Sequence, residues 1–492
     1  MRQPWSPARA FEPEVVVAHL GPTNSGKSHA ALAALAAAGA GVYAAPLRLL
    51  AREGYEKLRV GARAGLRTGE ERVDPGAPIL CCTAELTPLT GEVLVLDEVH
   101  WADDPERGWA WGRLLASAAY RQIHLVGAAN AEPLLRAAYG ERLEVRRTPR
   151  LVPLTWGGSV GVGEAPPGSL VVAFSRKAVL SLARQIGEAS GQRVGALYGA
   201  LPPQTRRAEI ERFVAGELDV LCVTDVIGHG INLPARTVVM AETSKWDGRR
   251  RRPLHLWEAA QIVGRAGRFG LAEAGDARVL RGVPGLEANA ALVRRAVEAA
   301  EGSRAAAPNL TSAPIRPTLD DLAASNGREL RAAVIAWHAQ AEAAALDERR
   351  WLRPAPLAGL AAALDALGHA GLLDSLGVEE LWRLGTLPVE DPAWLVELGR
   401  ALVDPSRRLR AAERREERAW SIEEAERTAA RARGLASLAG AFPGVGGLDR
   451  DELLAVEAAA ASRISELLEG EIAGNRFGVC GACRRPCPPW AA

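Results

Sequence analysis

The stretch GPTNSGKS, residues 21–28, has the residue types and spacing of a loop that holds phosphate. It matches the pattern G-x-x-x-x-G-K-[ST], follows the apolar run VVVAHL (15–20) and opens a stretch of helical periodicity. Its glycines let backbone N–H groups approach phosphate oxygens, and a helix N-terminus adds a positive field. Lys27 is expected to reach the β- and γ-phosphates, and the hydroxyl of Ser28 is expected to hold Mg²⁺. The sequence therefore predicts an ATP site formed by Gly21, Pro22, Thr23, Asn24, Ser25, Gly26, Lys27 and Ser28.

A pair of carboxylates ends the apolar run VLVLDEVH, residues 93–100. Asp97 is placed to bind Mg²⁺ through its water shell, and Glu98 is placed to polarise the attacking water. Taken alone, the pair could equally be a strand end that faces solvent, and the phosphate loop favours the catalytic interpretation. His100 would lie at the edge of this site, where it either senses the approach of a second sheet or is simply a packed histidine.

Two arginines in QIVGRAGRFG, residues 261–270, lie three positions apart among glycines. That spacing puts them on one face of a helix, although glycine is a poor helix former and gives a charge no cover. An anion is needed opposite them, and a bound triphosphate would supply it. We therefore expect Arg265 and Arg268 to be arginine fingers, which contribute roughly 10³–10⁵ in rate in such enzymes. Gln261, which begins the stretch, is assigned to the same catalytic group.

The elements that would position these residues alternate between two patterns from about residue 12 to 285. Continuous apolar strands separated by helical stretches predict parallel sheets that are covered by helices on both faces. A Pro/Gly-rich passage, residues 148–169, is expected to link two such sheets. The predicted strands are 15–20, 41–46, 78–84, 93–99, 123–129, 169–174, 193–199, 218–225 and 236–242.

The remainder of the chain has a helical pattern, and the strand signal disappears after about residue 286. The stretch 406–433 holds nine arginines and six glutamates. It is expected to form a long solvated helix with ion pairs along it, and an arm that tracks RNA is the alternative. The predicted amphipathic helices are 286–302, 318–347, 354–373, 376–403 and 449–470.

Composition bounds the class of protein without deciding its partner. A chain of 492 residues with 48% hydrophobic residues is long enough for about three domains, and its net charge of +1 argues neither for nor against nucleic acid. The N-terminal residues lack the apolar core of a signal peptide, and no run of 18 apolar residues occurs. These features predict a soluble protein located in the cytoplasm, without a membrane partner.

The six cysteines fall into two groups with different expectations. Cys81, Cys82 and Cys222 lie in apolar runs and are expected to be packed thiols. Cys480, Cys483 and Cys487 form C-x2-C-x3-C without a fourth cysteine. Structural zinc needs four ligands, so the tail either binds zinc with a ligand from elsewhere or carries free thiols.

Ten short motifs, in one order, resemble those of superfamily 2 helicases of the DExH type. More narrowly, they are similar to the RNA helicase of the mitochondrial RNA-degrading complex and its bacterial relatives, over about residues 15–285. The motifs are GPTNSGKS (21–28), APLRLLAREG (45–54), RTGEE (67–71), CCTAEL (81–86), DEVH (97–100), LVGAAN (125–130), AFSRK (173–177), LYGALPPQTRR (197–207), VTDVIGHGINLP (223–234) and QIVGRAGRFG (261–270).

This resemblance implies an α/β fold with two tandem RecA-like parallel-sheet domains and an all-α C-terminal domain. The implied boundaries are 1–150, 151–300 and 301–475, with a cysteine-containing tail at 476–492. It also implies an ATP- and Mg²⁺-dependent RNA helicase that moves 3′ to 5′ on a single strand. Support of RNA turnover with an exoribonuclease partner is a further implication.

Nucleic-acid contacts follow from the same resemblance and would reach phosphate and sugar rather than bases. Residues 241–255 contain Asp247-Gly248, a hairpin signal followed by a run of arginines, which resembles the strand-separating element of this class, and a charged surface loop is the alternative. The implied contact residues are Arg48, Thr83, Glu85, Arg176, Thr224, Arg249 and Arg250. Two other functions stay open: a DNA or RNA–DNA hybrid helicase in repair, and a nucleotide-dependent scaffold that binds RNA and recruits a nuclease without unwinding.

Overall fold

The computed structural model describes most of the chain from residue 9 to residue 473 and two short pieces of the tail, 478–479 and 486–487. The residues outside this description, apart from both chain ends, are 70, 226–232, 234, 247–249, 268–272, 284, 303–306, 323, 325, 346–350, 388–391, 405, 410–419, 474–477 and 480–485. Within the described part, every helix is too short or too polar to cross a bilayer.

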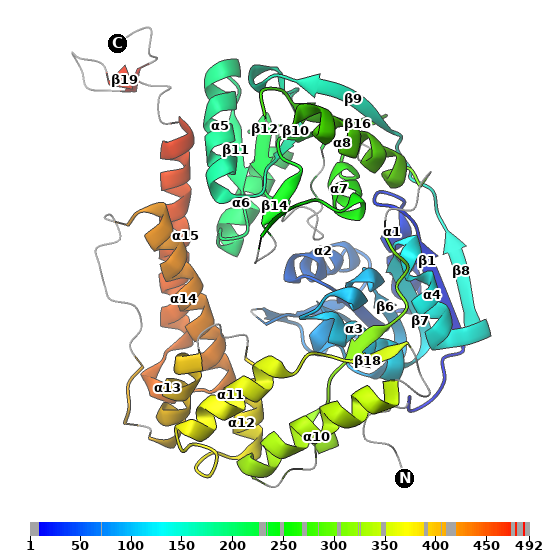
Figure 1. Ribbon diagram of the computed structural model, residues 1–492, viewed down its shortest axis with the longest axis vertical. Helices are drawn as coiled ribbons and strands as arrows, with labels where there is room; N and C mark the ends of the chain where they lie inside the picture. Colours follow the sequence, from blue (N-terminus) through cyan, green and yellow to red (C-terminus); the bar gives the residue numbers. More distant parts are fainter. Residues whose placement is uncertain are drawn as a thin grey trace.

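The first sheet has eight strands in the order β4-β3-β5-β2-β6-β7-β1-β8. In Figure 1 this sheet, drawn in blue to cyan, lies below the second sheet, which is drawn mostly in green. All neighbours are parallel except β3 and β4, as expected for continuous apolar strands joined by helices. Its strands are β1 (Val15–Leu20), β2 (Gly41–Ala45), β3 (Ala64–Arg67), β4 (Arg72–Val73), β5 (Ile79–Thr83), β6 (Thr90–Leu96), β7 (Ala119–Gly127) and β8 (Leu143–Arg147).

Helices cover both faces of this sheet, and each face has a hydrophobic cluster of its own. On one face, α1 (Lys27–Ala38) and α2 (Arg48–Leu58) bury Leu35 and Leu58. On the other, α3 (Gly108–Ser117) and α4 (Glu132–Tyr139) bury Trp111 and Leu134. Four short 3-10 turns complete this part: η1 (Ala84–Leu86), η2 (Val99–Asp103), η3 (Ala129–Ala131) and η4 (Gly140–Arg142).

The second sheet has six parallel strands in the order β11-β12-β10-β13-β16-β9. Its strands are β9 (Leu154–Val160), β10 (Ser169–Val172), β11 (Val194–Leu197), β12 (Val220–Val223), β13 (Thr237–Met240) and β16 (Gly275–Leu280). Its helices are α5 (Arg176–Ser190), α6 (Pro203–Val214), α7 (Leu256–Val263) and α8 (Leu286–Ala300). The turn η5 (Val162–Glu164) follows β9, and a hairpin of β14 (Ser244–Trp246) and β15 (Arg251–Pro253) projects from the sheet.

Both the two-sheet architecture and all nine predicted strands are confirmed, but the link between the sheets is shorter than expected. The passage 148–169 is not a linker throughout, because β9 lies inside it and forms the edge of the second sheet. Gly157 and Gly158 lie where the register of β9 against β16 shifts, and Gly158 has φ 81°. A bulged edge strand rich in glycine lacks the apolar run by which strands were identified.

The C-terminal part is helical, with one two-stranded parallel ribbon that contradicts the expected loss of strands after residue 286. The ribbon pairs β17 (Ala313–Ile315) with β18 (Leu352–Pro354). The helices are α9 (Leu319–Leu322), α10 (Gly327–Ala345), α11 (Ala358–His369), α12 (Val378–Gly385), α13 (Pro392–Val403), α14 (Ile422–Ala441) and α15 (Arg450–Ala473), with a short turn η8 (Val445–Gly447) before α15. In the tail, β19 (Gly478–Val479) pairs with β20 (Pro486–Cys487).

The prediction of one long solvated helix over 406–433 is wrong at its start and in its burial. Residues 406–409 are not helical, and α14 begins only at Ile422, where the side chain of Ser421 accepts from the backbone N–H of Glu424. Ala425 and Ala429 of α14 are buried in the hydrophobic cluster of the second sheet. Residues 410–419 lie outside the described part, so the alternative of an RNA-tracking arm stays a prediction.

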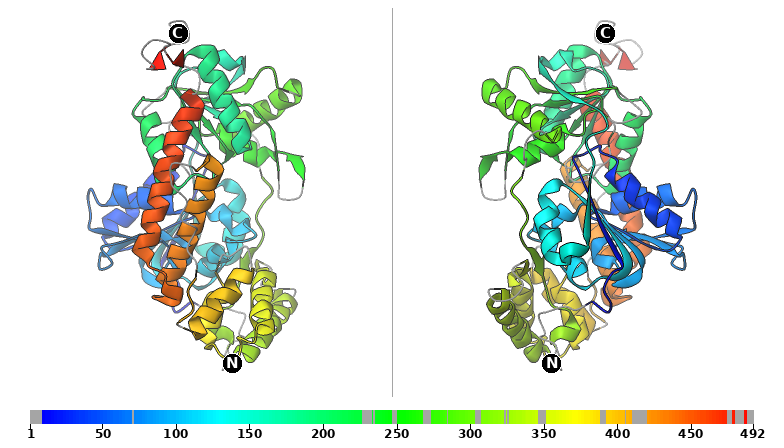
Figure 2. Two further views of the ribbon diagram at one scale, coloured as in Figure 1. Left: turned by 90° about the vertical axis from the view of Figure 1, so that its left-hand side faces the viewer. Right: turned by 90° about the vertical axis from the view of Figure 1, so that its right-hand side faces the viewer.

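The helical part joins both sheets. Ile315 of β17 belongs to the cluster that fills one face of the first sheet. The α14–α15 pair runs up to α5 and α6, where the hydroxyl of Thr205 donates to the carbonyl of Ala461 at 3.1 Å. Figure 2 shows these two helices, orange and red, passing along the side of both sheets. The three parts therefore form a closed ring of contacts rather than a string of independent domains.

Candidate functional site

The phosphate-binding loop lies between β1 and α1, as its pattern predicts. Gly21 donates its N–H to the carbonyl of Gly127 at 3.1 Å, and Gly26 caps the N-terminus of α1 in the left-handed conformation with φ 76°. Lys27 is buried, and its Nζ donates to the carbonyl of Pro22 at 3.0 Å, so the ammonium group folds back over the loop. The hydroxyl of Ser25 is buried and, among the described atoms, has no hydrogen-bond partner. A cationic side chain and an unsatisfied hydroxyl around a loop at a helix N-terminus fit a phosphate group.

Two residues predicted to hold Mg²⁺ lie together at the end of β6. The Ser28 hydroxyl donates to Oδ1 of Asp97 at 3.4 Å, and the hydroxyl of Tyr43 donates to Oδ2 at 2.7 Å. Burial and the neighbouring charge of Glu98 raise the pKa of Asp97 to about 6, although Tyr43 and Lys27 act in the opposite direction. A buried carboxylate beside a hydroxyl is a donor set that suits a hard cation. These residues therefore fit the expected metal.

Glu98 has the backbone strain and the charge state of a functional carboxylate. It adopts φ 49°, a left-handed conformation that costs a non-glycine residue of order 1–3 kcal/mol and that gathers at functional sites. Burial raises its pKa, but the charges of His100, Lys27 and Arg265 outweigh burial and leave the pKa of Glu98 below its ordinary value. The side chain is therefore ionised at neutral pH and can orient or polarise a water molecule.

The second sheet meets this site through α7 and the turn after it. Gln261 Nε2 and His100 Nε2 lie 3.1 Å apart, and His100 Nδ1 lies 3.3 Å from Oε2 of Glu98. A chain of polar contacts thus runs from Glu98 on the first sheet to α7 on the second. His100 is a contact between the sheets, which favours the first of its two interpretations.

The main chain of the two motifs approaches so closely that a side chain would not fit. A Cβ built on Gly264 would lie 2.2 Å from Oγ1 of Thr23. Asn24, in the left-handed conformation at φ 60°, directs Nδ2 at the carbonyls of Gly264 and Gly267, at 3.4 Å each. The absence of a side chain at Gly264 therefore permits this close approach of the two backbones.

Arg265 does not lie on a helix, although the spacing of the two arginines suggested a shared helical face. Helix α7 ends at Val263, because Gly264 and the turn after it interrupt the helix, so Arg265 lies in a turn. Burial lowers the pKa of Arg265, while the charges of Glu98 and Glu53 raise it. Glu98 is thus close enough to interact with the guanidinium. Arg268 lies outside the described residues.

The predicted nucleic-acid contacts are distributed over both sheets. Thr83 is buried at the end of β5, and Glu85 accepts from Arg107 Nε at 2.7 Å. Arg176 and Thr224 line one hollow of about 420 Å³ on the second sheet. Arg48 is exposed at the first residue of α2. These positions leave the expected contacts as predictions.

Arg176 and the basic hairpin need a more exact description. The guanidinium of Arg176 is held by Glu426 of α14 at 2.6 Å and by Glu423, so α14 covers it in this structure. The hairpin predicted within 241–255 is present, with Arg250 exposed beside β15. Arg249 and the Asp247-Gly248 turn lie outside the described residues.

The cysteines of the two sheets are packed thiols, as predicted. Cys81, Cys82 and Cys222 are buried and unpaired with one another, and burial raises the pKa of each, that of Cys82 to about 11. For the tail, Cys480 and Cys483 lie outside the described residues. The same holds for the side chain of Cys487. Among the residues that are described, no group of three or more His, Cys, Asp or Glu side chains could hold a metal, so these residues give no support for zinc.

Tyr43 is a site residue that the sequence analysis missed. In the parallel register it lies opposite Val95, two residues before Asp97, and it is the only hydroxyl in the apolar run GVYAA of β2. A polar atom in a strand that is buried on both faces needs a partner, and that requirement is the signal that could have identified it.

Several curated proteins are similar to this chain over its two sheets. A mitochondrial ATP-dependent RNA helicase SUV3L from Oryza sativa is 39% identical over 279 residues, which is 54% of this chain and 38% of the relative. SUV3 from Saccharomyces paradoxus is 37% identical over 286 residues, with the same shares of each chain. Human SUPV3L1 is 38% identical over 286 residues, which is 54% of this chain and 36% of the relative. The chain thus spans well under half the length of the relatives it matches.

One solved structure, Saccharomyces cerevisiae Dbp5 bound to RNA and ADP BeF3, covers 59% of this chain and 84% of its own. Its TM-score is 0.44 at 18% identity, and so weak a likeness says nothing about function.

The names of the curated relatives concern the expected cellular location. The relatives SUV3L, SUV3 and SUPV3L1 are all named as mitochondrial proteins, and this finding contradicts the cytoplasmic location expected from the sequence.

Two protein families match consecutive parts of the chain, and together they cover the site described above. Residues 2–147, with the phosphate loop and the DEVH motif, match the DEXQ-box helicase domain of Suv3. The fourth position of the DEXQ box, which is glutamine in the family's motif, is His100 in this chain. Residues 162–270, with α7 and Arg265, match the helicase conserved C-terminal domain. The chain therefore carries a Suv3-type DEXQ-box helicase domain followed by a helicase conserved C-terminal domain.

Proposed function

We propose that this chain is an ATP-dependent RNA helicase that couples ATP hydrolysis between its two sheets to movement along a single strand. One observation carries the proposal: the contacts from Glu98 through His100 to Gln261 join the catalytic carboxylate of one sheet to the helix that precedes Arg265 on the other. A site shared in this way responds to the approach of the sheets, so hydrolysis and relative movement of the sheets depend on each other.

Each residue has a distinct role in the proposed reaction. The loop of residues 21–28 binds the phosphates, with Lys27 as its cation, and Ser28 and Asp97 hold Mg²⁺. When bound, the metal neutralises charge on the phosphates. Glu98 orients and polarises the attacking water. Arg265, and Arg268 by resemblance, offset the charge that develops on the transferred phosphoryl group.

The substrate and the biological role rest on similarity. The relatives are named RNA helicases, which supports RNA as the polymer. That this RNA is single-stranded or carries a 3′ overhang is carried over from the resemblance alone. Movement from 3′ to 5′, support of RNA turnover and an exoribonuclease partner are carried over from the resemblance. We also propose the domain division 1–150, 151–300 and 301–475 with the tail 476–492, and zinc in that tail stays a prediction.

The test is turnover of ATP with RNA, with DNA and without polymer, followed by strand displacement on RNA, DNA and hybrid duplexes with 3′ or 5′ overhangs. Stimulation by RNA and displacement from a 3′ overhang support the proposal. Preference for DNA or hybrids would favour the repair helicase instead, and RNA binding without displacement would favour the scaffold. The Glu98→Gln variant is the control, and turnover that survives this substitution contradicts the proposed chemistry.

A further inference from the structure

The linker between the sheets lies against the phosphate-binding loop. After β8, Thr148 donates its N–H to the carbonyl of Leu20 at 3.0 Å, and Leu151 donates to the carbonyl of Asn24 at 2.9 Å. On the other side, Gly275 of the second sheet donates to the carbonyl of Pro153 at 2.8 Å. The linker is therefore a layer between the nucleotide loop and the second sheet rather than a free connection.

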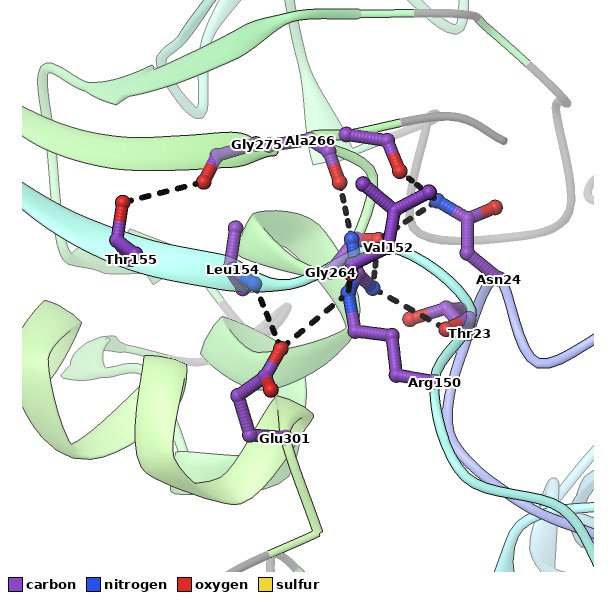
Figure 3. Close-up of polar contacts among 11 residues, drawn as sticks. Thr23, Asn24, Arg150, Val152, Leu154, Thr155, Gly264, Ala266, Gly275 and Glu301 are labelled. Atoms are coloured by element: carbon purple, nitrogen blue, oxygen red, sulfur yellow. Dashed lines mark hydrogen bonds and ion pairs between the residues drawn. The ribbon is translucent and has the colours of Figure 1, made fainter. Parts of the chain in front are cut away.

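Arg150, in the middle of this linker, has a buried side chain that is bound almost entirely by backbone carbonyls. Only 2% of the side chain is exposed. Its Nε donates to the carbonyl of Val152 at 2.7 Å, and its Nη1 donates to those of Thr23 at 3.1 Å and Gly264 at 2.8 Å. Its Nη2 donates to the carbonyl of Ala266 (Figure 3).

The charge of Arg150 is kept despite its burial. Burial lowers its pKa to about 10, and Glu301 at 3.5 Å raises it, so the guanidinium remains protonated at neutral pH. Glu301 is itself fixed by the N–H of Leu154 at 2.7 Å. A buried cation is tolerated when its donors are satisfied, and here carbonyls from three segments satisfy them.

Two of the carbonyls that Arg150 binds lie on either side of Arg265 in the chain. Gly264 precedes Arg265 and Ala266 follows it, so one guanidinium holds the peptide group directly before Arg265 and the peptide group that follows Ala266, at the two ends of the turn that carries Arg265. The same Nη1 atom holds Thr23 in the phosphate loop. Resting on the ATP-hydrolase function proposed above, we propose that Arg150 is a positioning residue that fixes Arg265 against the phosphate-binding loop.

Lysine cannot replace this arrangement. The carbonyls approach the guanidinium from different sides, and a planar fork of five donors reaches them together, whereas an ammonium group is a single point. Arg150→Lys therefore keeps the charge while releasing some of the carbonyls. A shift of the order of 1 Å at a reacting group costs about 10²-fold in rate. We expect Arg150→Lys to lower kcat about 10- to 100-fold and to leave the affinity for nucleotide within about twofold.

The experiment compares the wild type with Arg150→Lys. The control is Arg147→Lys, because Arg147 lies three residues earlier in the chain and its side chain is 63% exposed. The experiment measures kcat, KM for ATP and binding of fluorescent ADP, each also in an Arg265→Ala background. Because Arg150 acts through Arg265, Arg150→Lys should change kcat in that background by less than about twofold. An equal loss in both backgrounds, a parallel loss of ADP affinity, or an unchanged kcat in Arg150→Lys overturns the positioning role.

A second readout separates this proposal from the proposed function. The N–H groups of Arg265 and Ala266 donate to Ile262 and Val263 at 3.1 Å each, so their hydrogen exchange reports how firmly the turn is held. Arg150→Lys should accelerate exchange there, and Arg147→Lys should not. If wild type fails to hydrolyse ATP, the proposed function fails, and the exchange result still decides whether Arg150 fixes the turn. Exchange that is unchanged in Arg150→Lys contradicts the inference.

Discussion

Gly264→Ala tests directly whether the two sheets must touch during turnover. The added Cβ would lie 2.2 Å from Oγ1 of Thr23 and 2.8 Å from the carbonyl of Ala260, both below any real contact distance. The contact with Ala260 lies within helix α7, whereas the contact with Thr23 exists only when the second sheet and its helices meet the first. The substitution should therefore penalise the closed arrangement more than the fold.

The size of the effect follows from the cost of overpacking. Inserting one methyl group into a tight contact costs typically 1–3 kcal/mol. If about 2 kcal/mol of this cost falls on the closed arrangement, kcat drops by about 30-fold, since each 1.4 kcal/mol is a factor of ten. Thr23→Ala removes the closer of the two obstacles, so the double variant should recover part of the lost rate.

The assay is steady-state ATP turnover together with binding of fluorescent ADP and the melting temperature. The matched control is Gly434→Ala, in α14, where a Cβ meets nothing within 4 Å and alanine favours the helix. A Gly264→Ala protein with wild-type kcat would refute the reasoning. So would a loss of melting temperature large enough to account for the lost rate.

Three further predictions follow. Burial, and after it the charges of His124 and Arg146, lower the pKa of His19 to about 4. As the pH falls, His19 is therefore protonated in the unfolded chain before it is protonated in the folded protein, and the free energy of unfolding should fall by up to about 3 kcal/mol between pH 6.5 and pH 4. A melting temperature that does not change with pH in that window contradicts this prediction. Gly112→Ala places a Cβ 1.8 Å from the carbonyl of Pro314 and should loosen β17 from α3, measured as faster hydrogen exchange in β17; unchanged exchange there contradicts it. His100→Gln keeps a hydrogen-bonding group toward α7 and should hold kcat within about threefold, whereas His100→Leu should lower it about tenfold or more; equal rates in the two variants would remove the role of this contact.

The strands that carry the motifs were predictable because each is a continuous apolar run. In β1 and β10, residue after residue is buried, and such runs occur in strands covered on both faces. The phosphate loop was predictable because glycine, lysine and serine at fixed spacing have few other uses after such a strand. The carboxylates of Asp97 and Glu98 were predictable because they end the apolar run of residues 93–99.

Contacts between distant segments were not predictable, because nothing near each residue indicates its partner. Arg176 precedes Glu423 and Glu426 by some 250 positions, and only the fold of α14 brings them together. Arg150 lies in a short Pro-containing linker without periodicity, so its burial depends on how two sheets pack around it. The ribbon of β17 and β18 is too short for a pattern, since each strand has three residues.

The central claim is that one ATP site is built from both sheets, with nucleotide held by the first and turnover completed by the second. Arg265→Ala tests this most directly, measured as kcat and as the affinity for fluorescent ADP. The claim predicts that kcat falls roughly 10³-fold or more while ADP binds within about threefold of wild type. Turnover that survives the substitution, or ADP binding that is lost together with it, would contradict the claim.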